Sequence, residues 1–175
     1  MKTYVTHGLY IALAGFAVAL LLFVAGLHSD SARLAVATII HTVCHWGFGI
    51  LFITLAVRER RAAADPNQAF TYGDALWAGV ATALWTAIFN LIWVPVYFAV
   101  IDPGLNDLLL QAQLAKYQAS GLDGEKLDRI EHGLRISLST GGQTALAFVS
   151  AVIGGTVVAL IVGACFQRPA RPVQA

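Results

Sequence analysis

The sequence predicts an all-α polytopic membrane protein with four transmembrane helices and an outer amphipathic helical hairpin between helices three and four. Of its 175 residues, 58% are hydrophobic and only 12% are charged, whereas soluble domains carry about 25% charged residues. The charged residues are also clustered, so that four long stretches contain none. Each stretch exceeds the ~20 apolar residues that cross a bilayer core. We therefore expect a single integral membrane domain over residues 1–175.

This composition excludes several classes of protein. A mean hydropathy of +0.70 and so little charge exclude a soluble enzyme and a disordered chain. The formal net charge is +1 and there is no basic stripe, so we expect no nucleic-acid partner. Two cysteines are too few for a disulfide scaffold. The expected partner is the lipid bilayer.

The four charge-free stretches define the spans in chain order. Helix is the required form, because lipid offers backbone groups no hydrogen-bond partner. The first stretch follows Lys2 as a signal peptide would, but its apolar run of about 20 residues is longer than the ~7–15 of a signal core, so we expect a retained span. The predicted spans are residues 8–27, 33–57, 74–101 and 141–166.

Basic residues in the flanks of the spans indicate the orientation. One side carries six basic residues (Lys and Arg) and three acidic residues (Asp and Glu). The other side carries five basic and seven acidic residues. Both termini and the loop between the second and third spans lie on the more basic side, so we place them in the cytoplasm. The basic residues of that side are Lys2, Arg58, Arg60, Arg61, Arg168 and Arg171.

Residues 102–140 form the one sizeable segment outside the predicted spans. Leucines recur at helical spacing from Leu105 to Leu114, the pattern breaks at Ser120–Gly124, and it resumes from Leu127 to Leu138. This pattern predicts two amphipathic helices joined by a turn. The hairpin either lies on the outer membrane surface and caps the bundle, or offers a docking face to a partner protein.

The fourth span has the most specific pattern in the chain. Small residues recur every fourth position along one stripe, and such stripes allow two helix backbones to approach closely. We expect this stripe to pack on the first span, which carries small residues at looser spacing from Gly8 to Gly26. Homodimerisation through the stripe is the alternative. The stripe consists of Ala147, Ala151, Gly155, Ala159 and Gly163.

The third span contains two residues that are unusual in a transmembrane helix. Pro95 cannot donate a hydrogen bond to the carbonyl of Leu91, so we expect a kink near the outer end. Asn90 lies one turn below, near the middle of the membrane, where its amide needs an internal partner. We expect an interhelical hydrogen bond there, and a binding site is the alternative.

The second span holds the best candidates for chemistry. His41 and His45 lie one turn apart on one helix face, with Cys44 beside them. Intramembrane histidines are functional candidates, and the alternatives here are structural hydrogen bonds, a metal site, a haem site and a proton or ligand site. Zinc or copper would need further ligands, for which only Cys44, Asn90 and Cys165 are available. The spacing also differs from the Cys-x-x-Cys-His motif that attaches haem.

No catalytic motif accompanies these residues. The sequence lacks a P-loop, a Gly-x-Ser-x-Gly elbow, a His-Glu-x-x-His motif and paired carboxylates within a span. We therefore expect a protein that is not an enzyme and that has no cofactor, with metal or haem at His41 and His45 as the alternative.

The flanks of the third span carry short motifs of a known family. Phe70-Thr71-Tyr72-Gly73-Asp74-Ala75 and Gly79 lie at its start, and Ile101-Asp102-Pro103 lies at its end. In these motifs and in its whole layout the chain resembles the bacterial membrane-protein family known as domain of unknown function four-one-nine-nine. The resemblance implies an integral membrane protein with no established activity, and the family pattern does not include the pair of histidines. We expect the protein to lie in the bacterial inner membrane.

Elementary chemistry also accounts for these motifs. Tyr72-Gly73 is suited to a turn and interface anchor, where Gly73 permits close approach of the chain. Asp102-Pro103 is suited to a helix end, because proline disfavours helix in the residue before it.

These observations favour a non-enzymatic accessory, assembly or scaffold subunit. It would associate with itself or with another membrane protein through the small-residue stripe or the outer hairpin. One alternative is a small metal- or haem-binding redox protein that uses His41 and His45. Another is a ligand or ion translocator that oligomerises around Pro95 and Asn90.

Overall fold

The computed structural model describes residues 2–169, and within this range the chain is all-helical with no strand. This confirms the predicted all-α class. The elements are α1 (Lys2–Val24), α2 (Ser31–Ala63), α3 (Tyr72–Val96), the π-helix η1 (Tyr97–Ile101), α4 (Leu105–Ala119), α5 (Gly124–Ser137) and α6 (Thr140–Cys165).

Four of the described helices are long and apolar enough to cross a membrane: α1, α2, α3 continued by η1, and α6. They match the four predicted spans. The largest difference is at α1, which runs over Lys2–Val24 instead of residues 8–27. Its end is set by Gly26, which has a left-handed φ of +71° and lets the Leu27 N–H donate to the Leu22 carbonyl at 3.0 Å. This arrangement is a Schellman C-cap.

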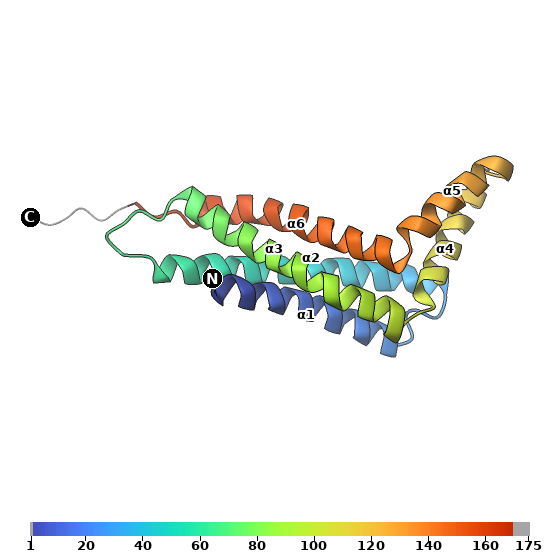
Figure 1. The fold of residues 1–175 in the computed structure, drawn as a ribbon, viewed down its shortest axis with the longest axis horizontal. Helices are drawn as coiled ribbons and strands as arrows, with labels where there is room; N and C mark the ends of the chain where they lie inside the picture. Colours follow the sequence, from blue (N-terminus) through green and yellow to red (C-terminus); the bar gives the residue numbers. More distant parts are fainter. Residues whose placement is uncertain (1, 170–175) are drawn as a thin grey trace, which may run out of the picture.

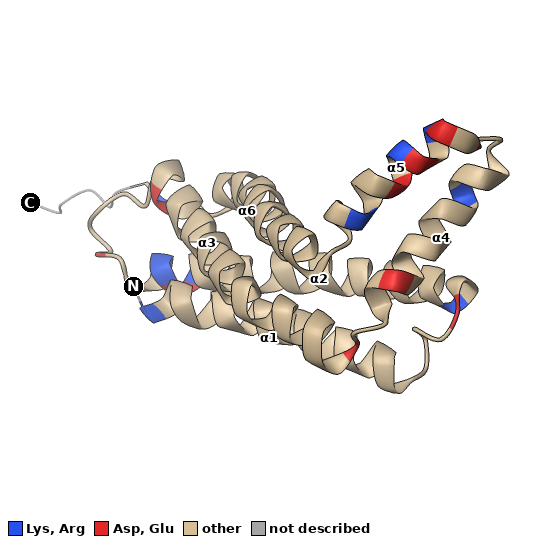
Figure 2. Ribbon diagram, turned by 45° about the vertical axis from the view of Figure 1, so that its right-hand side comes forward, with Lys and Arg blue, Asp and Glu red and all other residues tan. Residues whose placement is uncertain are grey.

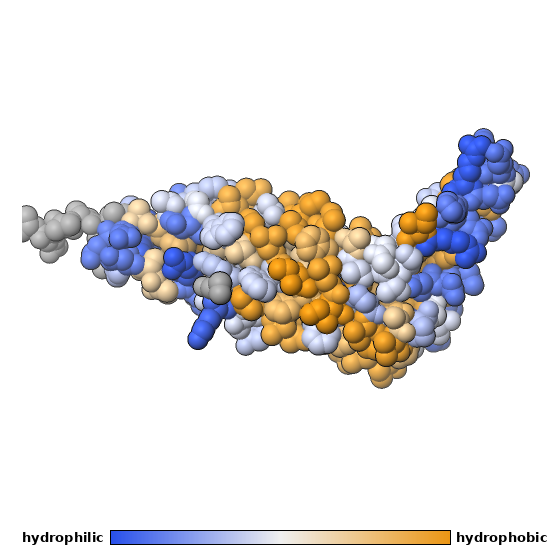
Figure 3. All heavy atoms as spheres, in the orientation of Figure 1, coloured by the Kyte–Doolittle hydropathy of each residue, from blue (hydrophilic) through white to orange (hydrophobic). Residues whose placement is uncertain are grey.

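The four long helices lie side by side along the long axis of the molecule (Figure 1). α3 packs against α6, α1 and α2, so it is the central helix. The described charges lie toward the two ends of the bundle and leave its middle uncharged (Figure 2). We call the end with Arg58, Arg60 and Arg61 the basic end, and the end with α4 and α5 the hairpin end. An apolar surface covers much of the bundle between them (Figure 3).

The small-residue stripe of α6 packs against α3, which corrects the expectation that α1 is its partner. A Cβ added to Gly79 of α3 would lie only 2.5 Å from the Cβ of Ala159, and one added to Gly155 would meet Ala83. Small residues on both helices therefore bring the two backbones together. The reason for the different pairing is that α3 carries its own small positions at the same four-residue spacing, including Gly79 and Ala83. A stripe engaged within the chain is not a free surface for homodimerisation.

The first helix uses its glycines elsewhere. A Cβ on Gly8 would lie 2.7 Å from the Trp85 Cβ of α3, and one on Gly15 would lie 3.7 Å from Nδ1 of His45 on α2. At the first of these contacts the Thr86 hydroxyl donates to the Gly8 carbonyl at 3.3 Å. α1 therefore packs between α2 and α3.

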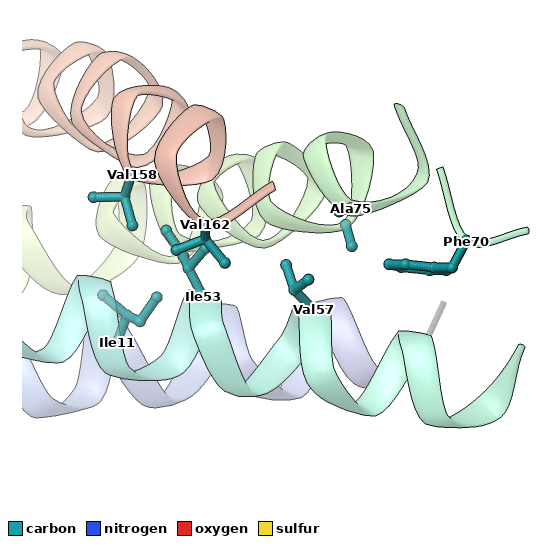
Figure 4. Packing of buried hydrophobic residues seen from close by; sticks show 8 residues of the cluster. Ile11, Ile53, Val57, Phe70, Ala75, Val158 and Val162 are labelled. Atoms are coloured by element: carbon teal, nitrogen blue, oxygen red, sulfur yellow. The ribbon is translucent and has the colours of Figure 1, made fainter. Parts of the chain in front are cut away.

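An apolar cluster fills the basic half of the bundle (Figure 4). Ile53 and Val57 of α2 are 1% and 0% exposed and lie at its centre. Residues of α1, α3, α6 and the loop before α3 surround them, so five segments, α2 included, share one core. The other members are Ile11, Phe70, Ala75, Ala78, Val158 and Val162.

The start of α3 is fixed by a capping box. The Thr71 hydroxyl accepts from the Asp74 N–H at 3.2 Å, and the Asp74 carboxylate accepts from the Thr71 N–H at 2.9 Å. Tyr72 and Gly73 consequently lie in the first turn of the helix and not in a turn before it, which corrects that interpretation. A Cβ on Gly73 would meet nothing closer than the Thr71 hydroxyl at 3.7 Å, so close approach does not explain this glycine.

The hairpin end of α3 changes its helical register two residues after Pro95. The chain continues as the π-helix η1, and the Asp102 N–H donates to the Tyr97 carbonyl at 2.9 Å. The helix then ends at Asp102-Pro103, as predicted from the constraint that proline places on the preceding residue. Proline removes one backbone donor from the helix, and the change of register occurs where we predicted a kink.

Helices α4 and α5 form the predicted hairpin. The turn between them contains Gly121 with φ +83° and leads to Gly124 with φ +52°. Leu105 and Leu110 of α4 are buried at the base of the hairpin. All residues of α5 are among those that the structure describes, and none of them is buried. The hairpin therefore packs at its base and projects from the bundle (Figure 1).

Candidate ligand-binding cavity

A cavity of about 470 Å³ lies in the hairpin half of the bundle, between α1, α2, α3 and α6, with α4 at its end. Its size is in the range of ~300–1,000 Å³ that is typical of small-molecule sites. Sequence reasoning did not predict it. Four of the predicted site residues lie in its wall, namely His41, His45, Asn90 and Ala147.

Small and aromatic residues create this space together. Ala12 and Gly15 of α1 and Ala147 of α6 are too short to fill it. Phe16 and Trp93 form an aromatic wall, with ring centroids 5.3 Å apart. The Nε1 of Trp93 is buried and has no acceptor among the described residues.

The predicted pair of histidines faces the cavity from α2. The rings of His41 and His45 are stacked, with centroids 6.1 Å apart and an angle of 17° between planes, as their i, i+4 spacing predicts. The side-chain hydrogen bonds found among the described residues include none from either imidazole. Cys44 is half-buried but is not part of the cavity wall. The backbone of Gly15 lies within hydrogen-bonding reach of the His41 imidazole, so His45 is the freer of the two to donate and accept hydrogen bonds in the cavity.

Asn90 contributes another free polar group. We expected its amide to bond to a neighbouring helix, but among the described residues it has no side-chain hydrogen bond, and it lines the cavity instead. The physical reason is that Asn90 faces this space and not a packed contact between helices. The alternative of a binding-site role therefore fits its position better.

The cavity narrows toward the basic end. A smaller cavity of about 80 Å³ continues from it past His45 and Ser150, and reaches Ile53 and Thr86. Beyond Ile53 the apolar cluster of Figure 4 fills the bundle. At the smaller cavity, α2 meets α6, where the Trp46 ring lies 3.3 Å from the Cβ position of Gly154.

A bonded group of three side chains lies at the hairpin end of the cavity. Nδ1 of His28 lies 2.8 Å from the Asp102 carboxylate and 3.2 Å from the Tyr97 hydroxyl. Tyr97 also donates to the Ala19 carbonyl at 3.1 Å. The His28 and Asp102 side chains are 9% and 12% exposed. This group ties the end of α1 to the end of η1, and so to the base of the hairpin.

Sequence reasoning missed His28 and Tyr97 as partners, and it treated Asp102 only as part of a helix end. A usable signal was present. Polar residues recur three, four or seven positions apart, and so on one helix face, in three otherwise apolar spans, and these residues line the cavity. They are Thr38, His41, Thr42 and His45 of α2, Asn90 and Tyr97 of α3 and η1, and Gln143 and Ser150 of α6.

A second histidine-carboxylate pair lies at the basic end, away from the cavity. Nε2 of His7 is 3.0 Å from the Glu59 carboxylate, with side chains 7% and 57% exposed. This pair joins α1 to α2. Near it, Arg168 anchors the α2–α3 loop through exchanged backbone hydrogen bonds of 2.9 Å with Phe70 and a side-chain bond of 2.8 Å to the Asp65 carbonyl.

The described residues contain no group of three or more His, Cys, Asp and Glu that could hold a metal ion. Cys165 is exposed at the end of α6, and neither cysteine is in a disulfide. The candidates for metal ligands in the cavity wall are the imidazoles of His41 and His45, with the amide of Asn90 on the same cavity. Zinc sites normally have at least three protein ligands.

Comparison with known families identifies the chain. Residues 6–168, nearly its whole length, match the family described as Protein of unknown function (DUF4199). The chain belongs to this family. No curated protein and no solved structure matches it.

In this DUF4199 protein the motifs that carried the resemblance have structural roles. Thr71 and Asp74 cap α3, and the Tyr72 ring packs on α6, 3.2 Å from the Cβ position of Gly163. Asp102 ends η1 and pairs with His28. Family membership thus confirms the resemblance.

Proposed function

We propose that the chain is an integral protein of a bacterial inner membrane, with four transmembrane helices and both termini in the cytoplasm. Four helices of sufficient length and apolarity support this placement. The separation of charge supports the orientation, because Arg58, Arg60 and Arg61 lie at the basic end and positively charged flanks are retained on the cytoplasmic side. The hairpin of α4 and α5 then lies outside the cytoplasm.

Within that membrane, the function we propose is non-enzymatic binding of a small lipophilic molecule. The cavity of about 470 Å³ is the observation that carries this proposal. It is mostly apolar, it contains a few convergent polar side chains, and it is closed at the basic end by a packed core. A site of this kind suits retention of a ligand more than passage of one, because a continuous path would have to cross the cluster around Ile53 and Val57.

The ligand would enter from the side. α2 and α6 touch at Trp46 and Gly154, and beyond this contact the cavity separates them. Leu146 lines the cavity and is 57% exposed, so the wall between α2 and α6 is incomplete. In a membrane this opening would face the outer half of the bilayer, which is the natural reservoir of a lipophilic molecule.

Quenching of tryptophan fluorescence tests the proposal. A brominated alkylphenol added to the protein in lipid nanodiscs should quench saturably, because Trp93 lies in the cavity wall. Ala147→Phe should weaken the saturable component, because its ring takes up part of the cavity. Val149→Phe is the matched control, since Val149 is 49% exposed on the same helix, and it should bind as the original protein does. Non-saturable quenching that is equal in all three proteins would overturn the proposal.

A second candidate function is that of an accessory subunit which docks through its hairpin to another membrane protein or to a second copy. The supporting observation is that α5 has no buried residue although it is a well-formed helix. Mild-detergent purification followed by mass measurement tests this. Removal of α5 by a deletion of residues 121–137 should abolish a co-purifying partner or dimer, and a free monomer before deletion would exclude this function.

A further inference from the structure

The charges and free hydrogen-bonding groups of the cavity restrict which molecule it can hold. This inference rests on the proposed binding function and names the ligand class. The cavity wall contains no Lys, Arg, Asp or Glu. The cavity also contains His28 at the hairpin end, but Nδ1 of this histidine is paired with the Asp102 carboxylate at 2.8 Å.

A charged headgroup would therefore be unpaired in this cavity. Burying an unpaired charge is strongly unfavourable, and the bilayer interior makes it more so. The wall supplies no cation for a phosphate and no free carboxylate for an ammonium group. The ligand must be uncharged where it lies within the bundle.

The free polar groups indicate what that uncharged part presents. Imidazoles of His41 and His45 lie on α2, the amide of Asn90 lies on α3, and Gln143 lies on α6. The Gly15 backbone is within hydrogen-bonding reach of His41, whereas the side chains of His45, Asn90 and Gln143 have no hydrogen bond to another described residue. Neutral imidazoles and amides can each donate and accept. Because they surround the cavity from three helices, a ligand that satisfies them needs polar atoms on more than one edge.

The shape of the wall favours a flat molecule. The imidazole rings of His41 and His45 are stacked, and Phe16 and Trp93 form the aromatic wall. Such faces pack well against planar rings. The incomplete wall beside Leu146 leaves room for a chain to extend into the membrane.

We propose that the cavity binds a quinone-type lipid, that is, an uncharged ring with oxygen atoms on opposite edges and a hydrocarbon tail. Carbonyl oxygens on the ring would accept from Asn90 on one side and from the imidazoles on the other. The tail would leave between α2 and α6. No electron transfer is part of this proposal.

Three probes with the same ten-carbon tail test the ligand class by native mass spectrometry of the purified protein. They are a benzoquinone, the benzene that lacks both oxygens, and a phosphate monoester. We expect the benzoquinone to bind at least tenfold more tightly than either of the others, which corresponds to about 1.4 kcal/mol. Equal binding of benzoquinone and benzene, or preference for the phosphate, would overturn the quinone assignment. Such results would leave the binding function intact.

A variant pair locates the site of discrimination. Asn90→Leu should weaken benzoquinone binding about tenfold and leave benzene binding unchanged, because it removes one polar partner and keeps the volume. Asn67→Leu, in the exposed loop before α3, is the control and should change neither. Unchanged benzoquinone binding in Asn90→Leu would contradict the quinone assignment. The binding function itself would be contradicted by a different result: none of the three probes binds the unmodified chain, and the brominated alkylphenol gives no saturable quenching.

Discussion

The two halves of this bundle are built from similar residues and pack in opposite ways. In the basic half, Gly79 of α3 meets Ala159 of α6, Gly155 of α6 meets Ala83 of α3, and the two backbones lie close together. In the hairpin half, Ala12, Gly15 and Ala147 also lie on facing helices, but they border a cavity of about 470 Å³. A small residue therefore brings two helices together only where the facing position is small and nothing larger holds the helices apart.

Larger side chains decide the outcome in each half. In the basic half, Ile53 and Val57 fill the space beside the α3–α6 contact. In the hairpin half, Phe16, Trp93 and Tyr97 stand between the helices and act as spacers. The packed half gives the bundle its stability, and the hollow half gives it a site.

The largest effect is expected where the backbones touch. Gly79→Leu should destabilise the fold by about 3 kcal/mol or more, because the new side chain has no room beside Ala159 and overpacking typically costs ~1–3 kcal/mol even in less crowded cores. Thermal unfolding in detergent measures this. Gly47→Leu is the control, since a Cβ at Gly47 would have no neighbour within 4 Å. Similar melting temperatures for the two variants would contradict the distinction between the halves.

An intermediate effect is expected at the bonded group that closes the hairpin half. Asp102→Asn keeps the shape of the side chain but removes its charge beside His28, and hydrogen bonds to charged groups contribute ~1.5–3 kcal/mol. We expect a loss in that range and faster hydrogen exchange at the base of α4. Asp107→Asn, an exposed substitution on α4 outside any described ion pair, should leave both unchanged. If exchange accelerates equally in both variants, the Asp102 pair does not hold the hairpin.

A smaller effect of opposite sign is expected from filling the cavity. Ala147→Phe places an aromatic ring in the hollow half, and cavity-filling substitutions commonly stabilise a fold by ~0.5–2 kcal/mol. The melting temperature should stay constant or rise. A fall as large as that of Gly79→Leu would mean that the hollow half is as tightly packed as the basic half.

The sequence predicted the elements better than their pairing. Long charge-free stretches and the break at Ser120–Gly124 determine helices through solvation and local geometry, and both were found. The four-residue spacing in α6 predicted close packing, but its partner depended on whether α1 or α3 offered small residues at matching heights. That match is a property of three-dimensional alignment, which spacing within one helix does not contain.

The candidate site was predicted in part for the same reason. His41, His45 and Asn90 stood out because polar groups are rare inside spans, and all three line the cavity. The cavity itself depends on Ala12, Gly15 and Ala147 remaining apart, and alanines that line a cavity have the same sequence signature as alanines in a helix contact. His28 was visible in the sequence, but its pairing with Asp102 joins residues far apart in the chain.

The smallest predicted effect concerns the turn between α1 and α2 at the hairpin end. Asp30 caps α2 by accepting from the Arg33 and Ala32 N–H groups at 2.9 and 3.0 Å, and these bonds, chiefly that from Arg33, hold the pKa of its carboxyl below the ordinary value. A carboxyl whose pKa is lower in the folded state stabilises that state above its unfolded pKa, and the contribution is lost as the pH falls through its folded value. Hydrogen exchange at the start of α2 should therefore gain a component that increases below about pH 4. Asp30→Asn keeps a capping oxygen that does not titrate, so this component should disappear. If it persists in the variant, another group at the hairpin end titrates, and the hollow half depends on pH through a contact other than this cap.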